Sequence, residues 1–176
     1  MTRPARVSFA APDLDAIAGM TGRLAVVVPG DGKLGPAARR VNRLTRGTLA
    51  RLAESERFAK AEPGAVLSLA FPAGLAAESL EVVKLDRRAG AEEARTAGAA
   101  LGKLLDDTGM TLLTGTLRSV VEVVEALVLR AYDYGDQKTA DAKVPGPVTV
   151  VTGDPDATQA ACADALAGAG GVFFPR

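Results

Sequence analysis

The chain has 176 residues, with 21 basic and 21 acidic side chains and no histidine. That length suits one domain able to bury a core, and zero net charge gives no overall attraction to nucleic acid or anionic lipid. The lack of histidine excludes Ser-His-Asp and Cys-His nucleophile systems and nearly every standard zinc site. The single cysteine, Cys162, cannot form an internal disulfide, which fits a reducing cytosol, and its alanine-rich surroundings predict a buried, inert thiol.

The first half of the chain predicts strands and one long helix. Short β-rich runs indicate strands over residues 5–10, 23–29, 65–71 and 80–86. The last two are joined by a loop too short for a crossover helix, so they should pair antiparallel. Between the strands at 23–29 and 65–71, helical spacing over residues 35–55 predicts one helix. Pro36 stands in its first turn, and its apolar face carries Val41, Leu44, Thr48 and Leu52.

The second half alternates helices and strands. Helices are expected over 91–107 and 119–132, strands over 110–115 and 147–152, and a last helix begins at Asp154 as N-cap with Pro155 following. Ser119 and Glu122 have the spacing of a capping box. The buried stripe of the 119–132 helix should carry Val120, Val124, Leu127 and Ala131. Alternation with one inserted hairpin predicts a three-layer α/β/α domain around a mixed sheet.

Membrane and export signals are missing from the pattern. The first residues, MTRPARVSFAAPD, lack the apolar core of a signal peptide. No apolar run approaches the ~20 residues that cross a bilayer. The chain is therefore expected to be soluble and cytoplasmic.

The stretch PGDGKLG places Gly30, Gly32 and Gly35 in a G-x-G-x-x-G pattern between a strand and a helix. Such glycines can let the backbone approach a pyrophosphate at a helix N-terminus. Two features oppose a dinucleotide site. The next strand ends in Phe-Pro rather than in an acid for a ribose, and the following helix is arginine-rich. The pattern therefore favours a plain strand-to-helix loop over a ligand-binding one.

Arg39, Arg43 and Arg46 fall on one stripe of the 35–55 helix, mostly without an acid three or four residues away. One hypothesis is a surface for anions or nucleic acid. The other is a solvated face, or one that meets acidic groups of a partner subunit, and the zero net charge favours it. The acidic pairs at 92–93 and 106–107 point in different directions on their helices, so we expect them to be solvated, with no metal or catalytic cluster.

Residues 129–139, LRAYDYGDQKT, follow an apolar run and hold both tyrosines. Tyrosines where a buried helix reaches the surface usually bury the ring and leave the hydroxyl in water. Gly135 could end the helix in a left-handed conformation. The residues themselves thus indicate a structural corner rather than an active site.

The same stretch resembles the end of the N-terminal domain of leucyl aminopeptidases, whose pattern is Gly-Ser-Tyr-x-Phe-Asp-x-Tyr-Lys-Thr. Tyr132, Lys138 and Thr139 match it, and Tyr134 stands for the Phe. Residues 31–72 are similar to the Gly-x-Leu and Phe-x-Gly-Lys blocks of that family, and residues 154–176 to its linker helix. The resemblance covers nearly the whole chain, with the motifs in the same order.

This resemblance implies a macro-domain-like body over residues 1–153 and a linker helix over 154–176, leading to a catalytic domain that is absent from the chain. It implies a non-catalytic role in packing and assembly, with the catalytic domain and sister subunits of a hexamer as partners. Two divalent ions, zinc or manganese, would lie in the absent domain, whose activity releases N-terminal residues from peptides. The open alternatives are a stand-alone macro-like module for ADP-ribose or another phosphate ligand at Gly30, Gly32 and Gly35, and a nucleic-acid binder using the arginine-rich helix.

Overall fold

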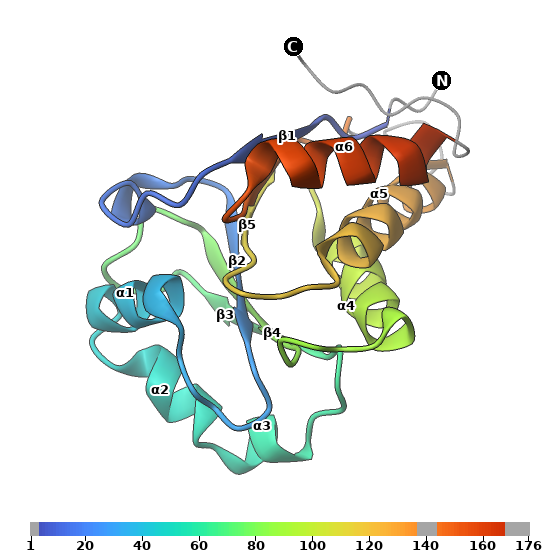
Figure 1. The fold of residues 1–176 in the computed structure, drawn as a ribbon. Helices are drawn as coiled ribbons and strands as arrows, with labels where there is room; N and C mark the ends of the chain where they lie inside the picture. The colour runs from blue at the N-terminus through green and yellow to red at the C-terminus, as the bar shows by residue number, and fades with distance from the viewer. Residues whose placement is uncertain (1–3, 137–143, 168–176) are drawn as a thin grey trace.

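A mixed sheet forms the centre of the computed structural model, which describes residues 4–136 and 144–167, without the side chains of 133–136 (Figure 1). The strand order is β1-β6-β5-β2-β4-β3. All neighbouring strands are parallel except β3 and β4, which form the expected antiparallel hairpin. The strands are β1 (Val7–Ala10), β2 (Arg23–Val28), β3 (Val66–Ala70), β4 (Ser79–Lys84), β5 (Met110–Leu113) and β6 (Val148–Val151).

Helices cover both faces of this sheet, which confirms the three-layer architecture. One face carries the 3-10 helix η1 (Ile17–Gly19) with α1 (Pro36–Leu44), α2 (Thr48–Ala53) and α3 (Glu56–Lys60). The other carries α4 (Ala91–Leu104), α5 (Val120–Asp136) and α6 (Pro155–Leu166). Figure 1 shows α1, α2 and α3 on the opposite side of the strands from α4 and α5.

Each face of the sheet has its own apolar core because side chains alternate along the strands. In β2, Leu24 and Val26 pack toward α1–α3, whereas Ala25 packs toward α4 and α5. The expected stripe of α5 is buried, with Val120, Val124 and Leu127 in the second core and Ala131 buried as well. Two buried glycines of α4 bring it close to α5. A Cβ atom on Gly98 would lie 2.2 Å from the Val123 carbonyl oxygen, and one on Gly102 would lie 2.6 Å from that of Leu127.

The single helix expected over 35–55 is wrong, because the chain breaks it after α1. Arg46 and Gly47 both adopt positive φ angles, of 53° and 83°. Thr45 turns its hydroxyl back onto the Val41 carbonyl oxygen, and the Asn42 side chain accepts a hydrogen bond from the Ala50 amide. Side-chain and left-handed caps of this kind satisfy the backbone groups that a helix end exposes.

Two helix ends also differ from expectation, and one agrees. The Ser119 hydroxyl is buried and has no hydrogen-bond partner within the described part of the chain, so the expected capping box is not formed. Helix α5 runs on through Gly135 to Asp136 rather than ending at the glycine. At α6 the expected cap is confirmed, since the Asp154 carboxylate accepts from the Ala157 amide and Pro155 opens the helix.

Candidate functional site

The glycine loop joins β2 to α1 and is closed largely by its own hydrogen bonds. The Gly30 amide donates to the Asp86 carboxylate at 2.7 Å, and the Gly32 amide donates to the Pro29 carbonyl oxygen at 2.9 Å. Gly32 alone of the three glycines has a positive φ, of 76°. A Cβ atom on Gly35, the N-cap of α1, would meet nothing within 4 Å. The structure thus gives Gly32 a conformational reason to be glycine, and an internal carboxylate already occupies the Gly30 amide.

A cleft opens beside this loop, at the carboxyl ends of β2 and β5. These neighbouring parallel strands are followed by connections on opposite sides of the sheet, and crevices at such switch points hold ligands in many α/β proteins. The cavity measures about 240 Å³. Its lining comes from the ends of β2 and β5, the start of α1, and the loops after β2, β4 and β5 (Val26, Val27, Pro29, Lys33, Leu34, Gly35, Ala37, Ala38, Leu85, Arg87, Leu113, Thr114, Gly115, Thr116 and Leu117).

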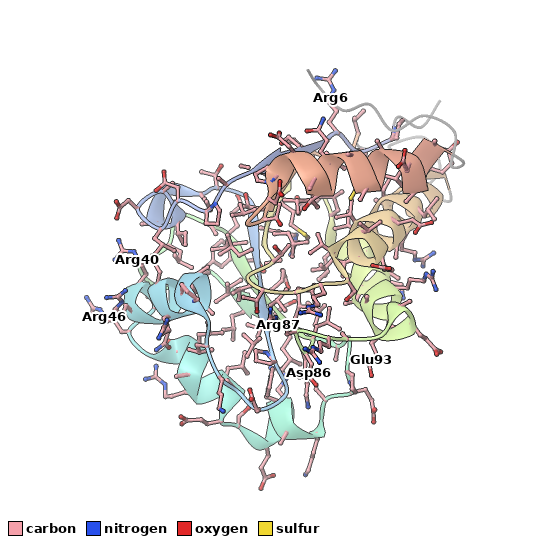
Figure 2. All side chains as sticks on the ribbon, viewed as in Figure 1. Arg6, Arg40, Arg46, Asp86, Arg87 and Glu93 are labelled. Atoms are coloured by element: carbon pink, nitrogen blue, oxygen red, sulfur yellow. The ribbon has the colours of Figure 1, made fainter. Side chains whose placement is uncertain are left out.

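The floor and the rim of this cleft differ in chemistry. The floor is formed by buried aliphatic side chains such as Val26, Leu85 and Leu113. The rim carries two exposed cationic residues, Lys33 and Arg87, from separate loops. Figure 2 shows Arg87 next to Asp86 in the region between α3 and α4. An apolar cavity with a few polar groups at its mouth is the usual form of a small-molecule site.

The arginines singled out in the sequence lie outside the cleft lining. Arg39 and Arg43 are exposed on α1, and Arg46 is exposed in the turn after it. Figure 2 shows Arg40 and Arg46 on the outer side of α1, away from the sheet. Arg40 donates to the Leu14 carbonyl oxygen at 3.3 Å. The break at residues 45–47 therefore turns the expected helical stripe into a basic surface shared by α1 and its following turn.

A buried charge that the sequence did not reveal lies away from the cleft, toward the end of the sheet where β2 begins. Glu81, in β4, is fully buried and accepts hydrogen bonds from the Ser68 and Ser79 hydroxyls. Arg23, the first residue of β2, pairs with Glu81 at 2.8 Å and with Asp106 at 3.1 Å. This corrects the expectation that the acid pair at 106–107 is simply solvated. We call these five residues the Arg23 network.

Within the Arg23 network, the charged forms of Arg23 and Asp106 are stabilised. Partial burial would lower the pKa of Arg23, but its hydrogen bond to Glu81 and the charges of Asp106 and Glu81 outweigh this and raise it. Partial burial would likewise raise the pKa of Asp106, yet hydrogen bonds from Thr108 and the charge of Arg23 lower it below 3.8. The network ties β2 to β4 and to the entry of β5, at the end of the sheet away from the cleft.

The remaining candidates are the tyrosine corner and the cysteine. Tyr132 is 45% exposed on α5. Tyr134 lies within α5 but its side chain is outside the described residues, as are Lys138 and Thr139 entirely. Cys162 is buried in the core, and burial, with the charges of Glu122 and Glu125, raises its pKa to about 11. A thiol with such a pKa is almost wholly protonated at neutral pH and is a poor nucleophile.

The described part of the chain has neither a metal-binding cluster nor a membrane-spanning helix. Residues 4–136 and 144–167 contain no group of three or more histidine, cysteine, aspartate or glutamate side chains placed to hold a metal ion. Within the same residues, no helix has both the length and the apolar character needed to span a bilayer.

Solved structures of similar fold include a leucine aminopeptidase and several macrodomains. A tomato leucine aminopeptidase mutant superposes with a TM-score of 0.66, at 13% identity, over 92% of this chain and 37% of that one. A macrodomain mutant from Oceanobacillus iheyensis superposes with a TM-score of 0.60, at 11% identity, over 92% and 91%. The chain is thus an α/β domain of macro-domain-like fold.

Curated relatives give a narrower assignment, although no family model matches the chain. A protein named probable cytosol aminopeptidase from Cereibacter sphaeroides is 44% identical over all 176 residues, and one of the same name from Dinoroseobacter shibae is 47% identical. The chain corresponds over its whole length to the N-terminal portion of cytosol aminopeptidases, as the resemblance in the sequence implied. It spans 36% of the length of these relatives.

Proposed function

We propose that the chain acts as the non-catalytic N-terminal domain of a cytosol-aminopeptidase-like protein, where it packs on the catalytic part and supports assembly. The observation that carries this proposal is the match of all 176 residues to only 36% of the relatives' length.

In this proposal residues 1–153 form the macro-like body, and residues 154–176, including α6, lead into the catalytic part. Helix α6 begins directly after β6 and packs on β1 and α5, so it is continuous with the body at its start. The basic surface of Arg39, Arg43 and Arg46 would face acidic groups of the catalytic part or of a sister subunit in a hexamer. The corner at Tyr132, Tyr134, Lys138 and Thr139 would be structural.

The parent protein would be a cytoplasmic, metal-dependent exopeptidase that releases N-terminal residues from peptides. Its two divalent ions, zinc or manganese, would be bound outside this chain. A two-metal site needs several ligands that converge on ions about 3.5–4 Å apart. Scattered surface carboxylates bind metal weakly and do not activate water in this way.

The test is hydrolysis of leucine p-nitroanilide by the purified 176-residue chain, with manganese, zinc or cobalt in excess. We expect a folded protein and no release of nitroaniline. A matched chimaera, in which this chain replaces the corresponding 36% of the Dinoroseobacter shibae relative, should be an oligomer and should hydrolyse the substrate. Chelator-sensitive turnover that follows the 176-residue chain through a sizing column would overturn the proposal.

A further inference from the structure

We propose that the cleft at the carboxyl ends of β2 and β5 binds a small organic anion with an aliphatic body, of the size of a branched-chain carboxylate. The site lies wholly within this chain. Its test therefore does not depend on the activity proposed for the parent protein.

The size and floor of the cavity define the body of the ligand. Its volume of about 240 Å³ is below the roughly 300–1,000 Å³ of pockets that enclose drug-sized molecules. Val26, Leu113 and Leu117 are buried beneath it, and the buried hydroxyl of Thr114 in the lining already donates to the Val151 carbonyl oxygen. A branched aliphatic chain gains from burial against such a floor, whereas a polar body would lose its hydration without replacement.

The rim defines the charge of the ligand. Lys33 and Arg87 reach it from different loops, and none of the described residues that line the cavity is acidic. Within residues 4–136 and 144–167, no acceptor takes a hydrogen bond from the amides of Gly115 and Thr116 at the same mouth. Cationic side chains and free amides beside apolar walls attract an anion, because the walls focus the field of the charges.

The same lining argues against a nucleotide. Among the described residues, the lining has no aromatic ring on which a base could stack and no acid that could bind a ribose hydroxyl. The Asp86 carboxylate already accepts from the Gly30 amide, and the Asp31 carboxylate accepts from the Lys33 amide. These two amides of the glycine-rich loop are therefore not available to a pyrophosphate. A compact anion at the rim with an aliphatic group on the floor fits better than ADP-ribose.

The experiment is an NMR titration of the 15N-labelled 176-residue chain with 4-methylpentanoate. We expect shifts of the Gly35, Gly115 and Thr116 amides and a dissociation constant of roughly 0.1–5 mM, as befits so small a ligand. The neutral 4-methylpentanamide lacks the charge, and acetate and inorganic phosphate lack the aliphatic body. The neutral amide should bind about fivefold more weakly, as expected for the loss of one partly exposed ion pair. Acetate and phosphate should also bind more weakly, because they cannot bury an aliphatic chain against the floor.

Variants separate the two cations from general charge effects. Lys33→Gln combined with Arg87→Gln should weaken 4-methylpentanoate about tenfold or more. The matched control, Arg39→Gln with Arg43→Gln, removes the same charge from outside the lining and should bind as the wild type does. All four side chains are exposed, so folding should be unaffected, which an unchanged NMR spectrum would confirm.

Any one of several results would overturn the proposal. They are no shifts up to about 20 mM 4-methylpentanoate, equal binding of the neutral amide, equal binding of phosphate as an adventitious ion only, and unchanged binding by the Lys33–Arg87 double variant. Tighter binding of ADP-ribose at the same amides would also overturn it, by replacing the aliphatic anion with a nucleotide.

Discussion

Replacing Arg23 by methionine should destabilise the domain far more than an ordinary surface substitution. The change removes the cation of the Arg23 network but keeps most of the apolar stem. Glu81 is fully buried, so its carboxylate would remain without a counter-charge. Breaking a buried pair in this way costs about 3–5 kcal/mol. We expect the lower end, about 3 kcal/mol, because the Ser68 and Ser79 hydroxyls still bind the carboxylate.

This loss of stability can be measured by urea and thermal unfolding, both monitored by circular dichroism. A loss of 3 kcal/mol corresponds to a fall in Tm of roughly 6–12 °C for a chain of this size. Lys60→Met is the matched control, since it breaks the exposed Lys60–Glu56 pair, whose side chains are 80% and 91% exposed. It should change stability by less than about 0.5 kcal/mol.

A double variant tests the reason for the loss. Arg23→Met with Glu81→Leu removes both charges, and replacing a buried pair by apolar residues is often close to neutral. The double variant should therefore be more stable than Arg23→Met alone. If Arg23→Met costs no more than Lys60→Met, or if removing Glu81 as well deepens the loss, the assignment of Glu81 as a buried charge is wrong.

Three further outcomes are expected. Gly98→Ala should lower the free energy of urea unfolding by about 1–3 kcal/mol, because its Cβ atom would lie 2.2 Å from the Val123 carbonyl oxygen. The control Gly153→Ala places its Cβ atom in open space and should lower it much less. Equal effects would contradict the close packing of α4 on α5. Asp106 has a lowered pKa, so its contribution is present above pH 3.8 and lost as pH falls through the folded value. Wild type and Asp106→Asn should differ in unfolding free energy by less than about 1 kcal/mol at neutral pH, because Asp106 is partly exposed. This difference should shrink at pH 3, and a larger difference at pH 3 would refute the lowered pKa of Asp106. Cys162, with a pKa of about 11, should react with Ellman's reagent at pH 8 only in urea, and rapid labelling of the folded chain would contradict its burial.

The strands were predictable because their signals are local. Continuous β-branched runs gave β2, β4 and β6, and the short loop between residues 65–71 and 80–86 gave the antiparallel hairpin. The helix break at Thr45–Gly47 also has a local signal, a threonine and a glycine. The helical spacing of apolar residues continued across this break, so a single helix was predicted. In the structure the buried position of α2 is Leu49 rather than the expected Thr48, as the interrupted helix requires.

Features that depend on distant partners could not be read from the chain. Glu81 looks like one polar residue in an apolar strand, and its partner Arg23 is 58 residues away. Lys84 likewise ends a strand in the sequence, yet its ammonium group donates to the carbonyl oxygens of Phe58, Ala59 and Ala61 at the end of α3. Such groups satisfy the last carbonyls of a helix only after the sheet has brought them together.

The position of the Arg23 network explains why the candidate cleft can lie where it does. Arg23 sits at the first residue of the central strand β2 and joins β4 on one side to the entry of β5 on the other. The chain connections diverge at the other end of β2 and β5, so the cavity forms there between the loops that follow β2, β4 and β5. The network joins β2, β4 and β5 near one end of the sheet, so the loops at the other end start from rigid strands. Sites positioned by rigid elements keep their geometry better than sites on loops alone. The ion pairs of Arg23 thus lie at one end of the strands, and the cleft with its basic rim lies at the other end. A domain that we propose to pack on other parts of a protein therefore also has a cleft of its own.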